Sequence, residues 1–431
     1  MVYHELGWIR SGGGKMCPLL KRAALEWYRP LRFLPCFLQK PLKYIRQRLR
    51  KVPVIVQLDA ACCGDFSFRK LAETAGCSVH RELPLINAFS AKVSARSLER
   101  LAKNVFVKKI WYDRCVRSVL DVASPVVQAP PLWQAEVTGR GVTVAVLDTG
   151  IYEHPDLSGR IVAFKDLVNN KTIPYDDNGH GTHVAGGIAS SGVMSGSLYR
   201  APAFEAGLVG VKVLDKEGKG KISSVIEGIQ WCIENKDLYS IRVLNLSVGA
   251  DATEPYTDDP VCLAVEKAWR DGIVICAAAG NEGPQSGTIG SPGIDPLIIT
   301  VGALDDGNTV NGEDDQVAYF SSRGPTVDGQ PKPDVIAPGV NIISLRSPGS
   351  HIDKKNKESR VNEWYTSLSG TSMAAPLCSG VVAQLLQHDA SLTPDQVKER
   401  LLKTARKIDN LDEYVQGAGV IDAKAAVLYK A

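Results

Sequence analysis

The residues best suited to chemistry in this chain of 431 residues are an aspartate, a histidine and a serine that stand beside glycine or other small residues. Asp148 ends the apolar stretch VTVAVL, His180 lies in DDNGHGTHVAGG, and Ser372 lies in LSGTSMAAP. A serine becomes a nucleophile when an imidazole takes its proton, and a buried carboxylate fixes the tautomer of that imidazole. The three residues therefore predict acyl transfer through an Asp–His–Ser triad.

A fourth candidate, Asn281, follows three alanines and a glycine in ICAAAGNEG. A side-chain amide at a rigid strand end can donate a hydrogen bond to the oxyanion that forms when a serine attacks a carbonyl. Ser372 precedes an apolar run, at the predicted start of a helix, where free N–H groups favour negative charge. We therefore expect Asn281 to meet the oxyanion.

The elements that must position these residues form a strand–helix alternation from residue 121 onward. Continuous apolar stretches of this kind are typical of strands buried on both faces of a parallel sheet. The predicted strands are GVTVAVLD, GLVGVKVLD, IRVLNLSVG, GIVICAAAG and LIITVGA. In open parallel sheets functional groups gather beyond the carboxyl ends of the strands, so we expect Asp148 and Asn281 at one sheet edge.

Two further segments precede this α/β domain. Residues 51–120 predict a small α+β domain in the order βαββαβ, which is typical of ferredoxin-like modules. Residues 1–50 form a basic arm, and residues 1–51 carry twelve Lys or Arg against two Glu. Two interpretations of the arm remain open: a solvated, partly helical tail, or a surface that contacts an anionic membrane or an acidic partner.

Several classes of protein are disfavoured by the sequence. No apolar run approaches the roughly 18–20 residues of a membrane span, and the first residues lack the apolar core of a secretory signal. The ten cysteines contain no C-x-x-C pair, so we expect reduced thiols and a cytoplasmic location. A P-loop is missing, the H-x-x-H of the histidine motif does not have zinc-site spacing, and no nucleic-acid readout motif occurs.

The motifs together resemble those of the subtilisin family of serine proteases, the subtilases. VAVLDTGI, NGHGTHVAG, AAAGNEG and SGTSMAAP are similar to that family's Asp, His, oxyanion-Asn and Ser motifs, in the family's chain order. The resemblance covers residues 121–431, and residues 51–120 are similar to the inhibitor-type propeptide of many subtilisins. The whole chain resembles the AprX-type cytoplasmic proteases of bacilli. This implies a serine endopeptidase that acts on proteins or peptides, needs no cofactor for its chemistry and is inhibited by its own propeptide.

The resemblance also implies roles for individual residues. The Ser372 N–H would join Asn281 in binding the oxyanion. Two segments would flank an extended substrate as neighbouring strands, and a third would form the wall of a pocket for a large apolar P1 side chain. These segments are Lys219, Gly220 and Lys221, then Ser247, Val248 and Gly249, and finally Ala278, Ala279 and Gly280.

Some features depart from the family pattern. Asp156 matches a calcium ligand, but the loop ASSGVMSGSLYR lacks the Asn-rich run that completes the site, so a structural calcium ion stays an open prediction. Residues 346–365 form a polar insertion that we expect to be exposed near the active-site rim. Residues 114–131 predict an extended junction, with self-cleavage between about residues 115 and 128. A catalytically silent relative that only binds peptides is the main alternative, and the intact triad motifs disfavour it.

Overall fold

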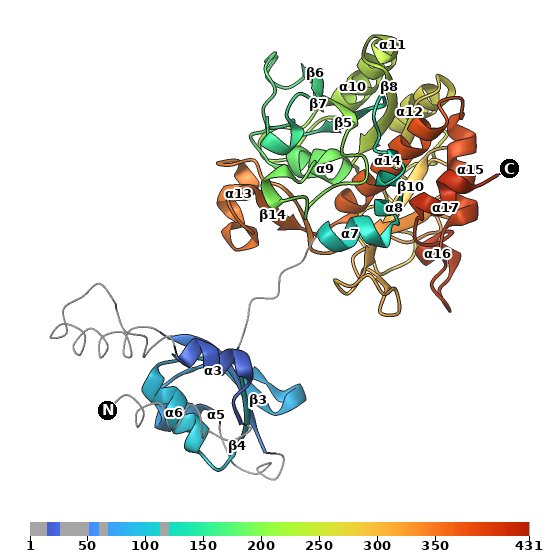
Figure 1. Cartoon of the computed structure of the whole chain (residues 1–431). Coiled ribbons are helices and arrows are strands. Elements are labelled where there is room, and N and C mark those ends of the chain that lie inside the picture. The colour runs from blue at the N-terminus through green and yellow to red at the C-terminus, as the bar shows by residue number, and fades with distance from the viewer. Residues whose placement is uncertain (1–14, 26–50, 60–67, 113–119, 431) are drawn as a thin grey trace. The chain divides into compact units, whose positions relative to one another are not determined.

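The computed structural model describes residues 15–25, 51–59, 68–112 and 120–430 (Figure 1). The chain divides into two compact units, Met1–Val116 and Arg117–Ala431, and each is considered by itself. Among the described residues, no helix has both the length and the apolar character needed to span a bilayer.

The small unit has the predicted ferredoxin-like order. Its antiparallel sheet has the strand order β2-β3-β1-β4. Every second residue of β1 is buried, because one face of the sheet packs against the helices. The elements are β1 (Val52–Leu58), α5 (Phe68–Ala75), β2 (Val79–Leu83), η4 (Pro84–Ile86), β3 (Ala88–Val93), α6 (Ala95–Lys103) and β4 (Val107–Tyr112).

Part of the predicted basic arm belongs to this small unit. The helix α3 (Pro18–Leu25) packs against β1 and β4, and the Cys17 N–H donates to the Ile110 carbonyl at 3.1 Å. Leu20 and Ala24 are fully buried in the core of the unit. The boundary predicted at residue 50 is therefore wrong for residues 15–25, because apolar residues among the arm's basic ones complete this core. The predicted membrane contact falls largely on residues outside those described.

The large unit contains the predicted mainly parallel sheet. The strand order is β11-β10-β9-β8-β5-β7-β6, with β12 also paired to β10. Among the described strands of this sheet, only β11 runs antiparallel to its neighbour. The strands are β5 (Thr143–Asp148), β6 (Ile161–Asp166), β7 (Gly207–Lys212), β8 (Ile241–Leu246), β9 (Val274–Ala278), β10 (Ile299–Asp305), β11 (Gln316–Val317) and β12 (Val335–Pro338).

Helices cover both faces of this sheet, as predicted. Leu147 of β5 lies near Gly228 of α10, whereas the next residue, Asp148, lies near Gly181 of α9. Successive strand residues point to opposite faces, so α10 and α9 lie on opposite sides. Helix α12 packs beside α10, and α14 beside α9 (Figure 1). The longer helices are α9 (His180–Ala189), α10 (Ile222–Glu234), α12 (Pro260–Arg270), α14 (Thr371–His388), α15 (Pro394–Thr404) and α17 (Ala423–Leu428).

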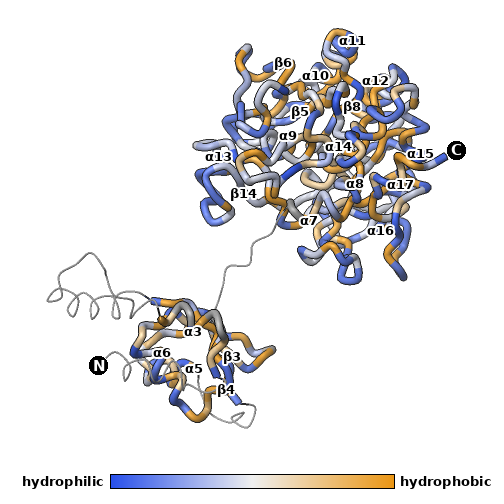
Figure 2. The backbone as a smooth tube through the Cα atoms, in the orientation of Figure 1, coloured by the Kyte–Doolittle hydropathy of each residue, from blue (hydrophilic) through white to orange (hydrophobic). Residues whose placement is uncertain are grey.

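Shorter elements complete the unit, and Figure 2 shows hydrophilic residues along many of its outer loops. A separate two-stranded hairpin, β13–β14, carries the short helix α13. These elements are α8 (Pro130–Trp133), η5 (Pro155–Leu157), η6 (Val193–Ser195), α11 (Lys236–Tyr239), β13 (Ile342–Leu345), α13 (His351–Lys355), η7 (Lys357–Ser359), β14 (Tyr365–Leu368) and α16 (Glu413–Gln416).

The predicted extended junction is helical where it is described. Helix α7 (Leu120–Val126) buries Ala123 in the main core, and Val122 and Val126 pack with a smaller apolar cluster. The Ser124 hydroxyl donates to the Arg200 carbonyl at 2.8 Å. The prediction of an extended backbone is wrong here. These side chains pack against apolar residues of the large unit, and this packing outweighs the tendency of Pro125 to interrupt a helix.

Candidate active site

Asp148 and His180 form a hydrogen-bonded pair at the carboxyl end of β5. The His180 Nδ1–H donates to the Asp148 carboxylate, with its oxygens at 2.8 and 2.9 Å. The Thr149 N–H donates to Asp148 Oδ1 at 2.7 Å. The Asp148 side chain is fully buried, whereas 23% of the His180 side chain is exposed. The pair therefore presents one imidazole edge to solvent and hides the carboxylate that orients it.

The pKa of His180 is raised above its ordinary value. Burial alone disfavours the imidazolium, but the charge of Asp148 and the hydrogen bond to it outweigh that cost. An imidazole in this setting is a stronger base than a free one. The geometry and the pKa both suit proton abstraction from a nearby hydroxyl.

The turn before His180 is organised by Asp176, which sequence reasoning missed. Asp176 Oδ1 accepts from the N–H groups of Asn178 and Gly179 at 3.0 and 2.8 Å. Its Oδ2 accepts from the N–H and the hydroxyl of Thr182 at 2.9 and 2.6 Å. This carboxylate ties the loop to the first turn of α9 and so fixes where His180 begins the helix. The Asp-Asp-Asn-Gly run was the signal that could have revealed it.

The second histidine of the motif, His183, belongs to the core. It is buried, and its Nε2 lies 3.0 Å from the Ile342 carbonyl oxygen. Burial lowers its pKa to about 3, so it is neutral at physiological pH. His183 therefore connects α9 to β13 and takes no part in proton transfer.

Ser372 lies in the first turn of α14, between buried Thr371 and buried Met373, and is itself partly exposed. Its Oγ–H donates to the Ser247 carbonyl at 3.2 Å, and the Ser247 hydroxyl donates to the Ser372 carbonyl at 3.0 Å. Among the described residues, no hydrogen bond links Ser372 to His180. The structure thus holds the serine against the end of β8, with its hydroxyl turned to a backbone carbonyl.

Asn281 is exposed, and its amide is oriented by the start of α14. Its Oδ1 accepts from the Thr371 N–H at 2.9 Å, and the Thr371 hydroxyl lies 3.1 Å from the same oxygen. The Asn281 NH2 group therefore points away from Thr371, and within the described part of the chain it has no acceptor. The Ser372 N–H likewise has no acceptor there, so two donors are left free beside the serine.

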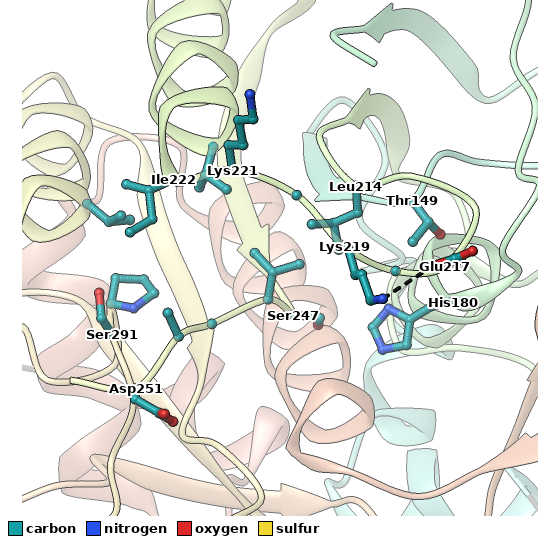
Figure 3. Close-up of a pocket in the computed structure, with 18 of the residues that line it drawn as sticks. Thr149, His180, Leu214, Glu217, Lys219, Lys221, Ile222, Ser247, Asp251 and Ser291 are labelled. Atoms are coloured by element: carbon teal, nitrogen blue, oxygen red, sulfur yellow. Dashed lines mark hydrogen bonds and ion pairs between the residues drawn. The ribbon is translucent and has the colours of Figure 1, made fainter. Parts of the chain in front are cut away.

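A cleft of about 750 Å³ runs along the edge of the sheet, and His180 lies in its lining. Its walls include Lys219–Lys221 on one side and Ser247–Gly249 on the other, where the resemblance placed them. Figure 3 shows Lys219 beside His180, with the Lys219 ammonium 3.3 Å from the Glu217 carboxylate. Two backbone segments on facing walls leave room for an extended chain between them.

A second hollow, of about 360 Å³, shares Ser247–Asp251 with the cleft and lies beside Ser372 and Asn281. Ala278 and Gly280, which the resemblance assigns to the wall of a P1 pocket, line this hollow. Ala279 does not, and the prediction is wrong for this residue. Its side chain is fully buried in a cluster with Cys262, Ile289 and Ile294, because alternate residues at the end of a strand point to opposite sides.

Asp156 is surrounded by hydrogen-bond donors rather than by metal ligands. Its Oδ1 accepts from the Met194 N–H at 2.9 Å, and its Oδ2 accepts from the hydroxyls of Ser190 and Tyr365 at 2.8 and 2.6 Å. Calcium takes six to eight oxygen ligands, whereas the groups that contact this carboxylate are an N–H group and two hydroxyl groups that donate to it. The residues present do not fit calcium at Asp156, because Tyr365 and Ser190 already satisfy the carboxylate.

These features agree with comparisons to known proteins. The profile of the Subtilase family matches residues 139–419, which is more than half of the chain. The chain belongs to the subtilase family. It is a serine protease of the subtilisin type, and therefore a hydrolase that acts on proteins or peptides.

Two curated relatives and one solved structure illustrate this membership. The chain is 46% identical to serine protease AprX of Bacillus subtilis (strain 168), over 99% of both chains. It is 35% identical to subtilisin E of the same strain, over 81% of this chain and 83% of the relative. A crystal structure of a cold adapted subtilisin-like serine proteinase is 32% identical and covers 66% of this chain and 90% of its own, with a TM-score of 0.53. The resemblance read from the motifs is thereby confirmed at the level of family and fold.

Proposed function

We propose that this subtilase is an endopeptidase in which Ser372 is the nucleophile, His180 the general base and Asp148 the residue that orients the imidazole. The peptide docks between Lys219–Lys221 and Ser247–Gly249 as an added strand. Ser372 Oγ attacks the carbonyl carbon while His180 takes its proton. His180 returns that proton to the leaving amine, and water then hydrolyses the acyl-enzyme.

The observation that carries this proposal is the Asp148–His180 pair at a cleft that is also lined by Ser247, the residue to which Ser372 is hydrogen-bonded. In the free enzyme the Ser372 hydroxyl is bonded to the Ser247 carbonyl. A substrate strand that pairs with Ser247–Gly249 would supply backbone N–H groups that compete for that carbonyl. Loss of this acceptor would free the hydroxyl to turn toward His180, because catalytic hydrogen bonds often form only when substrate is bound.

The tetrahedral oxyanion is stabilised by the Asn281 NH2 group and the Ser372 N–H. Both donors are free, and the Thr371 bonds to Asn281 Oδ1 fix the amide beforehand. Donors that are already oriented cost no reorganisation when charge develops on the carbonyl oxygen. Hydrolysis of a peptide or of casein by the wild type, and its loss in Ser372→Ala, tests the assignment. Equal rates in the two proteins would contradict it.

We further propose a preference for large apolar P1 side chains. Small residues, Ala278 and Gly280 among them, line the hollow beside Ser372 and leave space for a ring or a branched chain. Glu282 also lines it, but its carboxylate accepts from the Asn281 N–H at 2.7 Å. A set of peptides that differ only at P1 should give the highest kcat/KM for Phe, Tyr or Leu. Faster cleavage after charged residues would contradict this preference.

The small unit is proposed to be an inhibitory propeptide that the enzyme removes by itself. Because α7 is helical and packed on the large unit, we place the cleavage before Leu120, between residues 115 and 119, which lie outside the described residues. Intact-mass analysis should show two fragments for the wild type and one full-length chain for Ser372→Ala. A wild type that stays intact while active on peptides would contradict self-processing.

We also propose a cytoplasmic location and an arm that contacts a membrane surface or an acidic partner. Five cysteines in the described ranges are free thiols, namely Cys77, Cys232, Cys262, Cys276 and Cys378, which supports a reducing compartment. The excess of basic residues over residues 1–51 supports the second proposal. Binding of the arm to vesicles containing anionic lipid, compared with neutral vesicles, tests it.

A further inference from the structure

The polar insertion at residues 346–365 is an ordered part of the structure. It joins β13 to β14, which pair as an antiparallel hairpin with Ile342 opposite Leu368 and Leu345 opposite Tyr365. Helix α13 begins after Ser350, whose hydroxyl accepts from the Asp353 N–H. The prediction that the insertion is exposed is correct for His351, Lys354 and Lys355. Ser350 and Asp353, at the base of the insertion, are buried.

Asp353 anchors this base. Its carboxylate accepts hydrogen bonds from Arg346 Nε at 2.5 Å, from Arg360 Nε at 2.6 Å and from the Gly349 N–H at 2.9 Å. Burial opposes the charge of Asp353, but these bonds and the adjacent guanidinium groups lower its pKa to about 2. A buried carboxylate held by two arginines fixes α13 relative to the hairpin.

The same helix is attached to the loop that carries His180. The His351 N–H donates to the Asp177 carbonyl and the Ile352 N–H to the Asn178 carbonyl, both at 2.9 Å. The Ser350 hydroxyl packs against Gly179, where an added Cβ would lie 2.6 Å from its oxygen. Helix α13 therefore has a fixed place at the end of the cleft where His180 lies.

From this place α13 contributes to the lining of the substrate cleft. His351, Ile352, Lys355 and Asn356 line the same cleft as His180. The Lys355 ammonium has no hydrogen-bond or ion-pair partner among the described residues, whereas Lys219, another residue of the lining, is paired with Glu217. Lys355 is thus an uncommitted positive charge on the wall of the cleft.

The carboxylates in the lining of the cleft do not pair with Lys355. Asp259 caps α12 by accepting from the N–H groups of Val261 and Cys262. Asp251 lies toward the other end of the cleft from Lys219 and His180 in Figure 3, and Glu254 follows it three residues later. Two lysines of the lining, Lys221 and Lys355, are therefore left without an ion-pair partner among the described residues.

We propose that α13 is a third wall of the substrate cleft and that Lys355 selects an acidic side chain at the P2 position of the substrate. This inference rests on the proposed docking of the peptide as a strand. Successive side chains of an extended peptide point to opposite sides. When P1 enters the hollow beside Ala278, P2 is directed to the cleft that His180 and Lys355 line.

The test uses fluorogenic peptides that share a P1 Phe and differ only at P2, as Glu, Gln or Lys. The wild type should cleave the Glu peptide about threefold faster than the Gln peptide, measured as kcat/KM, since a solvent-accessible charge pair has effects of this size. Lys355→Gln should reduce this ratio to about one, and Lys355→Glu should favour the Lys peptide. The ratio of the wild type should also fall at 0.5 M salt.

Lys354 provides the matched control, because it is an exposed lysine on the same helix that is not part of the cleft lining. Lys354→Gln should keep the wild-type ratio. An equal ratio in wild type and Lys355→Gln, or an equal change in Lys354→Gln, would overturn the role of Lys355. A ratio near one in the wild type would likewise overturn the role of Lys355. Failure of the proposed function itself would appear differently, as no cleavage of any of the three peptides by the wild type.

Discussion

The most discriminating prediction concerns Asn281, whose two amide atoms have separate tasks in the proposed mechanism. Its oxygen accepts from the Thr371 N–H at 2.9 Å and lies 3.1 Å from the Thr371 hydroxyl, while its NH2 group is free for the oxyanion. Asn281→Asp keeps the acceptor and removes the donor, whereas Asn281→Ala removes both. If the NH2 group is the catalytic donor, both variants lose activity.

The expected effects on kcat and on stability differ enough in size to be measured separately. Loss of the oxyanion donor should lower kcat by about 10²–10³, or about 2.7–4 kcal/mol, a magnitude taken from subtilisin itself, which is a relative of this chain, rather than from this structure. Loss of the bonds to Thr371 is a stability effect of about 1 kcal/mol each. Asn281→Asp should therefore unfold at a midpoint close to that of the wild type, yet lose at least as much kcat as Asn281→Ala.

Steady-state hydrolysis of one P1-Phe peptide, together with urea unfolding in a Ser372→Ala background to prevent autolysis, measures both quantities. KM should change little, because the lost bond forms only in the transition state. A fully active Asn281→Asp variant would refute the reasoning, since Asn281 would then act only by holding Thr371.

Three further predictions follow from charges and burial near the site. Asp148→Asn should lower kcat by about 10⁴ and move the acid limb of the kcat/KM profile to lower pH, because Asp148 raises the pKa of His180; an unmoved limb would argue against the pair. Asp353→Asn should reduce the free energy of unfolding, measured by denaturant titration, by about 3 kcal/mol. This stability difference should be fully present above about pH 4 and should disappear as the pH falls through about 2, because the pKa of Asp353 is lowered to about 2 in the folded protein. Peroxide should inactivate the enzyme in step with oxidation of Met373 and not of the more exposed Met194, as followed by peptide mapping, and Met373→Leu should resist; inactivation that tracks Met194 would contradict this.

The sheet and its active edge could be predicted because their signals are local. Continuous apolar stretches identified β5, β8 and β9. A polar residue ends or follows each of these strands, and these residues indicated the sheet edge at which Asp148 and Asn281 lie. The small ferredoxin-like unit was likewise readable from its alternating strand and helix patterns. In both units the pattern of burial follows directly from the period of the element.

The features that sequence reasoning missed depend on contacts between distant segments. The Tyr365 hydroxyl donates to the Asp156 carboxylate, although the two residues are 209 positions apart in the sequence. The family resemblance implied that this carboxylate binds calcium. Helix α13 bonds to the Asp177 and Asn178 carbonyls, which nothing in its polar sequence indicates. The strand-end position of Ala279 decided its burial, because its direction depends on where β9 ends. Such outcomes are set by tertiary packing, so a one-dimensional pattern carries little information about them.

The central claim is that the hydroxyl of Ser372 is the nucleophile activated by His180. The most direct measurement is intact and tryptic mass spectrometry after reaction with a fluorophosphonate. We expect one label per active chain on the peptide that contains Ser372, greatly slowed in His180→Ala and lacking in Ser372→Ala. A label on any other residue, or an active enzyme that takes up none, would contradict the account.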